Sequence, residues 1–421
     1  MAGRCNAVVE LDATPAAAET PVVAEPDLGP GPAGWTGMRG VAEIPSYILM
    51  QPTTLCNLDC AYCYLPGRSV DHRMSEQVAA AVAATVNAWA QRVERFSVVW
   101  HGGEPLAAGR EHLATLMAPF AQVEHHVQTN ATLIDDAWCE FFLTHQVEVG
   151  ISVDGPATRS ALRVDRAGHP AYDRILRGVE ALRRHGIRFA VICVVSDPTP
   201  ELATELYQYF SELGCYWLGI NVEEREGVNT RDNTRSETQV REFWAELTAA
   251  WAADPRLELR EVEWSLHYLG AALRGEADTV LPRQRDPVPT VAHDGRVVLF
   301  SPELAGFNSV PGYGDFALGN VLDTSLDEIV SAVARRPTGW VAEYFAGVEQ
   351  CRRTCPYFGF CGGAHASNRY FETGRFDVTE TEHCRNTKIR LLEGVLDHAG
   401  RHRDAQPAGT AAQGGTGSQG G

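Results

Sequence analysis

The stretch YILMQPTTLCNLDCAYCY, residues 47–64, is an apolar run followed at once by three cysteines. The run predicts a buried strand, and Cys56, Cys60 and Cys63 then lie together on one short loop at its end. Three thiolates at this CxxxCxxC spacing can bind three irons of a [4Fe–4S] cubane, which leaves the fourth iron open. The alternative is a set of buried or zinc-binding cysteines, but three ligands without a nearby fourth fit structural zinc poorly.

From residue 45 to residue 279, apolar runs alternate with amphipathic stretches of helical period. The candidate strands are YILMQ (47–51), FSVVWH (96–101), HHVQT (125–129), VEVGISV (147–153), RFAVICVVS (188–196) and YWLGINV (216–222). The helix-like stretches lie at about 75–94, 110–120, 135–145, 171–186, 199–213 and 236–253. Such alternation predicts parallel strands joined by helical crossovers. We therefore expect an α/β fold, a partial (β/α)6 barrel of the TIM type, whose chemical groups gather at the C-terminal ends of the strands.

The segments that flank this barrel differ in composition. Residues 1–44 are rich in Ala and Pro and predict a disordered leader that is too short to fold as a separate domain. Residues 396–421 are rich in Gly and predict a disordered tail. Between the barrel and this tail, residues 280–395 lose the alternation. A short hairpin at 293–303, a helix at 325–335 and a cysteine-rich segment predict a smaller second domain there.

The totals limit the partners of the chain. Its 421 residues carry a net charge of −18, so it should repel phosphate backbones and anionic lipids, which disfavours nucleic acid and membrane surfaces as partners. The sequence shows no signal peptide and no apolar run of about 18 residues, which predicts a cytoplasmic protein. In that reducing compartment, its eleven cysteines favour metal binding or catalysis over disulfides.

A second motif, WHGGEP, ends the second candidate strand. Paired glycines let a backbone approach a ligand closely, and the carboxylate of Glu104 can face an ammonium group. CxxxCxxC after the first strand and GGE after the second together resemble the radical SAM superfamily. The resemblance implies that the open iron binds S-adenosylmethionine and that Gly102, Gly103 and Glu104 contact its methionyl amino group. It also implies that Tyr62 packs near the adenine.

The third and fourth candidate strands end in further polar residues. The segment VQTNATL places Asn130 near the barrel mouth, among the expected cofactor-binding residues. The segment SVDGP, followed by RVDR, resembles peptide-modifying members of the superfamily. This pattern implies that Ser152 hydrogen-bonds the ribose or the carboxylate of the cofactor and that Arg163 pairs with the carboxylate. Asp154 is either a turn cap or a site residue, and for His101 we expect a satisfied buried histidine rather than a catalytic base.

Four further cysteines lie near the C-terminal end of the chain, namely Cys351, Cys355, Cys361 and Cys384. Four thiolates in a loop-rich segment are enough for a closed [4Fe–4S] cluster. Zinc is the alternative, because all-cysteine zinc sites of similar spacing are common. Beside a radical SAM core, we expect iron–sulfur.

This cysteine-rich segment resembles the SPASM domain, the auxiliary-cluster appendage of radical enzymes that modify peptides. A full SPASM domain has a cysteine where this chain has His365, and further cysteines in the preceding hairpin, where this chain reads GRVVLF (295–300). The ligands of the first auxiliary cluster are therefore missing, whereas those of the second are complete. We expect two clusters in all, and whether His365 binds a metal stays open.

The segment CPYFGFCGGAHASNRYFETGRFDVTETEHC is closest to one branch of these enzymes, the cyclophane-forming and glycine-rich-repeat peptide maturases. The resemblance implies a radical SAM oxidoreductase that joins an aromatic ring carbon to a side-chain β-carbon of a ribosomally made precursor peptide. Reduction of its first cluster calls for an electron donor such as flavodoxin or ferredoxin. The catalytic base is not identified by any motif.

Two other functions stay open. The first is a sulfatase-type maturase that forms formylglycine, or an enzyme that makes another peptide crosslink such as a thioether. The missing cluster ligands count against the sulfatase type, which normally carries both auxiliary clusters. The second is a non-catalytic iron–sulfur or zinc protein for electron transfer or docking, which would need neither a GGE motif nor an open iron.

Overall fold

The computed structural model describes residues 40–232 and 234–405. The expectations for residues 1–39 and 406–421 lie outside this part of the chain. Within it, six strand–helix units follow one another as predicted. The strands are β1 (Tyr47–Met50), β2 (Ser97–Trp100), β3 (Glu124–Thr129), β4 (Val147–Ser152), β5 (Phe189–Val195) and β6 (Trp217–Val222). The helices are α1 (Glu76–Ala90), α2 (Arg110–Met117), α3 (Asp136–Thr144), α4 (Tyr172–Arg184), α5 (Pro200–Leu213) and α6 (Glu237–Ala253).

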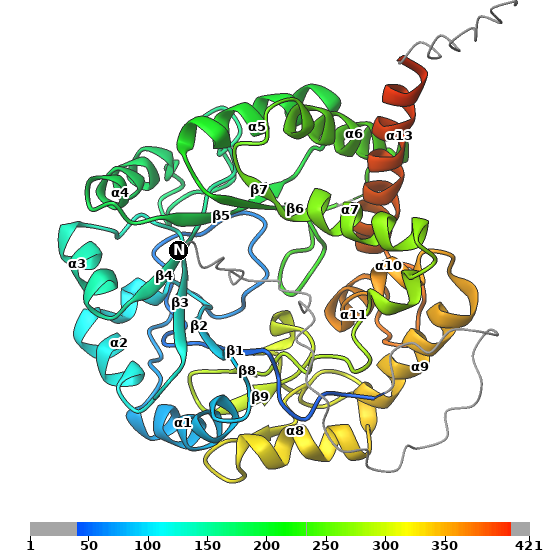
Figure 1. Cartoon of the computed structure of the whole chain (residues 1–421). Helices are drawn as coiled ribbons and strands as arrows, with labels where there is room; N and C mark the ends of the chain where they lie inside the picture. The colour runs from blue at the N-terminus through cyan, green and yellow to red at the C-terminus, as the bar shows by residue number, and fades with distance from the viewer. Residues whose placement is uncertain (1–39, 233, 406–421) are drawn as a thin grey trace, which may run out of the picture.

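These six units form the predicted partial barrel. Strands β1 to β6 pair in sequence order and are all parallel, and their helices lie around the outside (Figure 1). Four helices begin where a short polar side chain accepts a backbone N–H of the first turn, which satisfies a donor that has no partner inside the helix. These caps are Ser75, Asp135, Thr199 and Ser236.

The sheet continues beyond the six predicted strands at both ends. Its order is β10-β9-β8-β1-β2-β3-β4-β5-β6-β7, and the added elements are β7 (Glu258–Leu259), α7 (Arg260–Leu273), β8 (Thr290–Val291), β9 (Arg296–Val298) and β10 (Gly319–Asn320). The predicted hairpin is made by β8 and β9, and β8 pairs in parallel with β1 through Leu49 and Thr290. The hairpin that we assigned to a separate second domain therefore extends the barrel sheet.

The C-terminal part is helical. Its elements are α8 (Leu326–Arg335), α9 (Gly339–Thr354), α10 (Phe358–Cys361), α11 (Ala366–Thr373), α12 (Glu382–Cys384), a π-helix η4 (Arg385–Ile389) and α13 (Arg390–Ala405). Short 3-10 turns occur at η1 (Pro105–Ala108), η2 (Ala277–Thr279) and η3 (Pro302–Leu304). The second group of cysteines thus lies on helices and their ends, not in the loop-rich segment that we expected.

Helix α13 packs on α6. Arg241 of α6 pairs with Asp397 of α13, and the indole N–H of Trp244 donates to the carbonyl of Asn386 at 2.8 Å. The two helices approach closely at Gly394, where an added Cβ would lie 2.6 Å from the carbonyl oxygen of Arg241. The helix also runs ten residues into the region from 396 that composition had predicted to be disordered, and ion pairs from Asp397 and Arg401 join this part to α6.

The contact at Gly394 provides a test of the packing. Gly394→Ala places a methyl group against the backbone of α6, so we expect the free energy of unfolding to fall by about 1–3 kcal/mol. Gly400→Ala, in the same helix with no atom within 4 Å of the new Cβ, should raise it by about 0.5–1 kcal/mol. Urea unfolding of the two variants measures both effects. Equal changes in the two variants would show that α13 does not pack on α6 in this way.

Candidate functional site

The first three cysteines lie on the loop between β1 and α1, at the C-terminal end of the barrel strands. Their thiols are close enough for the charges of Cys60 and Cys63 to raise the pKa of Cys56. The loop is held against the end of β2 by Gly103, whose missing Cβ would lie 2.7 Å from the carbonyl oxygens of Thr53 and Leu55. Gly103 therefore has a packing role beside the cofactor contact that the resemblance implies.

Glu104 is the buried carboxylate beside this loop. It is 1% exposed, and it accepts hydrogen bonds from Thr129 Oγ1 at 2.6 Å and from the Asn130 N–H at 2.8 Å. Burial raises the pKa of Glu104, while these hydrogen bonds oppose the rise. Its charge also raises the pKa of Cys56. The carboxylate thus lies next to the first cysteine, where an ammonium group bound at an open iron would compensate its charge.

Asn130 and Ser152 differ in how closely they approach the cysteines. The Asn130 side chain donates to Asn57 Oδ1 at 2.9 Å and lies 3.8 Å from the Cys56 sulfur, so it belongs to the cysteine loop. Ser152 lies at the end of β4 and accepts a hydrogen bond from Gln128 at 2.9 Å. The structure therefore joins Asn130 to the cysteines directly and places Ser152 on a neighbouring strand end.

Asp154, whose role the sequence left open, is the centre of a buried polar contact. It pairs with Arg163, whose Nη2 is 3.1 Å from its carboxylate, and it accepts the Tyr62 hydroxyl at 2.5 Å. It also accepts the backbone N–H of Val194 on β5 at 3.1 Å. Arg163 extends its other terminal nitrogen to 4.0 Å from Cys60 Sγ. Asp154 thus ties the cysteine loop to β4 and β5, and Arg163 is engaged by this carboxylate, a pairing that the motif did not suggest.

The donors of this loop fit a cubane. Burial raises the pKa of Cys56 to about 12 and that of Cys60 to about 11, so binding of iron as thiolates releases their protons. Across residues 40–232 and 234–405, no group of three or more His, Cys, Asp or Glu side chains is arranged to hold a single metal ion. A cubane differs from a single ion, because each of its cysteines binds a different iron.

The second four cysteines also come together. The thiols of Cys361 and Cys384 are hydrogen-bonded, which lowers the pKa of Cys361 and raises that of Cys384. The charges of Cys351 and Cys355 also act on Cys384. Helices α9, α10 and α12 therefore bring together all four cysteines that the sequence grouped, a donor set that suits a closed cluster.

The family model for the radical SAM superfamily matches residues 50–224, which include the first three cysteines, Glu104 and Arg163. A protein of Synechocystis sp., itself uncharacterised, is 33% identical over 368 residues, which cover 83% of this chain and 90% of that protein. The chain belongs to the radical SAM superfamily. Membership implies a [4Fe–4S] cluster and S-adenosylmethionine.

Other relatives of this radical SAM protein are named for their activity. A serine-type anaerobic sulfatase-maturating enzyme of Bacteroides thetaiotaomicron is 25% identical over 356 residues, which cover 78% of this chain and 84% of that enzyme. The solved structure of anSMEcpe with bound AdoMet has a TM-score of 0.66 at 22% identity and covers 85% of this chain and 97% of that one. Streptococcus suis SuiB bound to its precursor peptide SuiA has a TM-score of 0.58 at 15% identity and covers 82% and 76%. The two structures confirm the fold.

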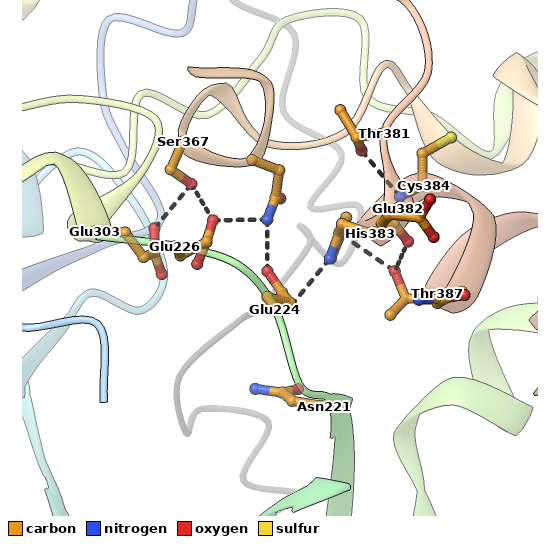
Figure 2. Close-up of polar contacts among 12 residues, drawn as sticks. Asn221, Glu224, Glu226, Glu303, Ser367, Thr381, Glu382, His383, Cys384 and Thr387 are labelled. Atoms are coloured by element: carbon orange, nitrogen blue, oxygen red, sulfur yellow. Dashed lines mark hydrogen bonds and ion pairs between the residues drawn. The ribbon is translucent and has the colours of Figure 1, made fainter. Parts of the chain in front are cut away.

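The radical SAM barrel carries one polar network that no motif predicted. Directly after β6, Glu224 lies 2.9 Å from His383 Nδ1 and accepts Asn368 Nδ2 at 2.6 Å (Figure 2). Glu226 accepts the same Asn368 nitrogen at 2.7 Å and the Ser367 hydroxyl at 2.6 Å (Figure 2). The network joins the barrel mouth to the residue before Cys384. The available signal was the charged run EEREG at the end of a barrel strand.

The same segment also contacts the first cysteine loop. Gly227 has a positive φ of 55°, and an added Cβ would lie 2.1 Å from the carbonyl oxygen of Tyr64, the residue after Cys63. The next residue, Val228, donates its N–H to that carbonyl at 2.9 Å. The chain after β6 therefore lies between the two groups of cysteines. His365 faces this region too, because its ring packs edge-on against His383 at 5.4 Å.

We expected His101 to be a buried histidine with both ring nitrogens hydrogen-bonded, but among the described residues it is partly buried and only one of its nitrogens has a partner. Its Nε2 lies 3.0 Å from the Tyr64 hydroxyl, whereas its buried Nδ1 has no hydrogen-bond partner in the described part of the chain. Burial lowers the pKa of His101 to about 4, so its ring is neutral near pH 7.

Of the helices that the structure describes, none is both long and apolar enough to cross a bilayer.

The depressed pKa of His101 makes stability depend on pH. Below pH 6.5 the unfolded chain binds a proton that the folded chain does not bind until about pH 4, so stability is lost as the pH falls through this window. The loss should be about 2 kcal/mol between pH 6.5 and pH 5. We expect His101→Gln to reduce the total loss by about this amount, although His125, whose pKa burial also lowers to about 4, keeps its own share. The exposed control His169→Gln should leave the loss unchanged. Urea unfolding at the two pH values measures the difference, and identical losses in both variants would contradict the assignment.

Proposed function

We propose that this radical SAM protein is an oxidative maturase of a ribosomally made precursor peptide. In the proposed reaction, an aromatic ring carbon becomes bonded to a side-chain β-carbon, which closes a cyclophane. Cys56, Cys60 and Cys63 would hold the cluster, and S-adenosylmethionine bound there would supply a 5′-deoxyadenosyl radical once it receives an electron. The β-carbon gives a hydrogen atom to that radical. The ring carbon loses its hydrogen as a proton, and one electron leaves with it.

The convergence of the four C-terminal cysteines carries this proposal. Formation of the new bond releases one electron from the substrate, because one hydrogen departs as an atom and the other departs as a proton. A second [4Fe–4S] cluster on Cys351, Cys355, Cys361 and Cys384 would accept this electron. The chain after β6 contacts Tyr64 next to Cys63 and His383 next to Cys384, so a substrate at the barrel mouth would lie near the acceptor. A flavodoxin- or ferredoxin-type protein would supply the electron that starts the reaction.

A peptide substrate is supported by the open sheet. Within residues 40–232 and 234–405, the sheet ends in β10 on one side and β7 on the other, each paired on one edge only. An extended peptide can add to such an edge through main-chain hydrogen bonds. Two solved structures of this fold also hold peptides, since anSMEcpe was solved with the Cp18Cys peptide and SuiB with its precursor peptide SuiA.

For the cofactor we propose roles that follow the contacts. Glu104 binds the methionyl ammonium, and the backbone at Gly102 and Gly103 shapes its pocket. Ser152 and Asn130 hydrogen-bond the cofactor's polar groups. Tyr62, fixed by Asp154, packs beside the adenine, and Arg163 contributes its positive charge next to Cys60.

Sulfatase maturation is the second candidate, because several relatives carry that name. Such an enzyme would oxidise a serine or cysteine of a sulfatase to formylglycine. Against it stand His365 and the segment GRVVLF (295–300), which occupy positions where a full auxiliary set has cysteines. Of the ten described cysteines, only Cys139, Cys193 and Cys215 lie outside the two groups.

Metal content tests the two clusters. Anaerobic reconstitution should give about eight irons per chain, and Ala at Cys56, Cys60 and Cys63 should lower this to about four. Ala at the four C-terminal cysteines should likewise leave about four. About twelve irons would mean that a third cluster uses other ligands. Zinc in place of the second four irons would remove the electron acceptor from the proposal.

The product tests the reaction. Co-expression with a candidate precursor peptide should remove two hydrogens per core, and the variant lacking the first three cysteines should leave the peptide unchanged. Oxidation of serine to formylglycine removes two hydrogens as well, so mass alone does not separate the candidates. Tandem mass spectrometry should show no fragmentation between the joined residues, and a hydroxylamine probe should find no aldehyde. A trapped aldehyde would favour sulfatase-type chemistry.

A further inference from the structure

One basic residue near the second cysteine group differs in type from all the others. The chain has 36 basic residues, and Lys388 is the only lysine among them. It lies on the π-helix η4, one turn after Cys384, and is 7% exposed. Its ammonium lies over the ring of Trp264, 5.0 Å from the centroid. π-Helical turns are rare and often occur at functional sites.

A second buried cation lies on the other side of the group. Arg369 of α11 is 1% exposed and sends Nη2 to 3.4 Å from the Cys351 sulfur. Its other acceptors are backbone carbonyls, among them that of Gly363 at 2.8 Å. Gly347 leaves room for this guanidinium, because an added Cβ would lie 2.0 Å from its Nη1. The position of Arg369 is therefore built into the packing of α9 and α11.

Neither cation has a carboxylate partner within 4.0 Å in the described part of the chain. Asp377 is close enough to Arg369 for its pKa to be lowered, but it pairs with Arg375. Burying an unpaired charge is costly unless an opposite charge compensates it. The nearby cysteines become anionic when they bind iron. Arg369 donates to the Cys351 sulfur at 3.4 Å, and Lys388 lies one turn after Cys384.

We propose that Lys388 and Arg369 are the counter-charges of the second cluster and that they raise its reduction potential. The inference rests on the proposed function, since it needs a [4Fe–4S] cluster on these cysteines. Such a cluster with four thiolates carries two negative charges, and a third when it gains an electron. A buried positive charge therefore stabilises the reduced form more than the oxidised form. Lys388 and Arg369 are positioning residues that make the cluster an electron acceptor.

Lys388 is the residue to change, because its side chain makes no backbone hydrogen bond whose loss would unfold the site. The first cluster is removed by Ala at Cys56, Cys60 and Cys63, so that one cluster remains. In this full-length background, Lys388→Met removes the charge and Lys388→Arg keeps it. Arg274→Met removes an exposed charge that pairs with Glu276 and serves as the matched control. Redox titration followed by electron paramagnetic resonance gives each midpoint potential.

We expect Lys388→Met to weaken electron acceptance about tenfold, a fall of about 59 mV in midpoint potential for one electron. Lys388→Arg and Arg274→Met should stay close to the parent. If Lys388→Met loses its iron while Lys388→Arg retains it, the counter-charge role is supported through affinity instead. Equal potentials in the Met and Arg variants, with iron retained in both, would overturn the inference. Absence of iron in the parent background would overturn the second cluster itself.

Discussion

The approach of β2 to the cysteine loop is the constraint on which the first site depends. Gly103 lies so close to the carbonyls of Thr53 and Leu55 that no side chain fits between them. This contact brings Glu104 beside Cys56, because the two lie on the facing segments. A larger residue at position 103 would separate the carboxylate from the thiols before it touched any cofactor. The glycine thus sets the distance between metal ligands and the buried acid.

The two cysteine groups differ in the charge around them. Beside the first group, Arg163 is paired with Asp154, so the positive charge there is balanced by a negative one. Beside the second group, Arg369 and Lys388 bring positive charge without a carboxylate partner within 4.0 Å among the described residues. Second-shell charge and hydrogen bonds to sulfur tune cluster potentials. This difference suits a first cluster that donates an electron to a sulfonium and a second that receives one.

The sequence predicted the barrel well because each of its six units has its own hydrophobic period, and four of the six helices begin at a capping side chain. It also identified all seven grouped cysteines and Glu104, since these occur in short motifs at strand ends. It missed β7, which is two residues long, and the pairing of β8 with β1, which joins distant segments. The contacts of Glu224 and Asp154 could not be predicted either, because their partners lie far away in the sequence and no repeating pattern connects them.

The contact between α6 and α13 has a consequence for synthesis on the ribosome. Arg241 and Asp397 are 156 residues apart, so at roughly 5–20 residues per second the second arrives about 8–30 s after the first. During that interval the barrel units can form in order, but the apolar side of α6 around Trp244 has no cover. An exposed surface of this kind invites association with other nascent chains. Translation of α13 therefore ends the period in which the apolar side of α6 is most prone to aggregate.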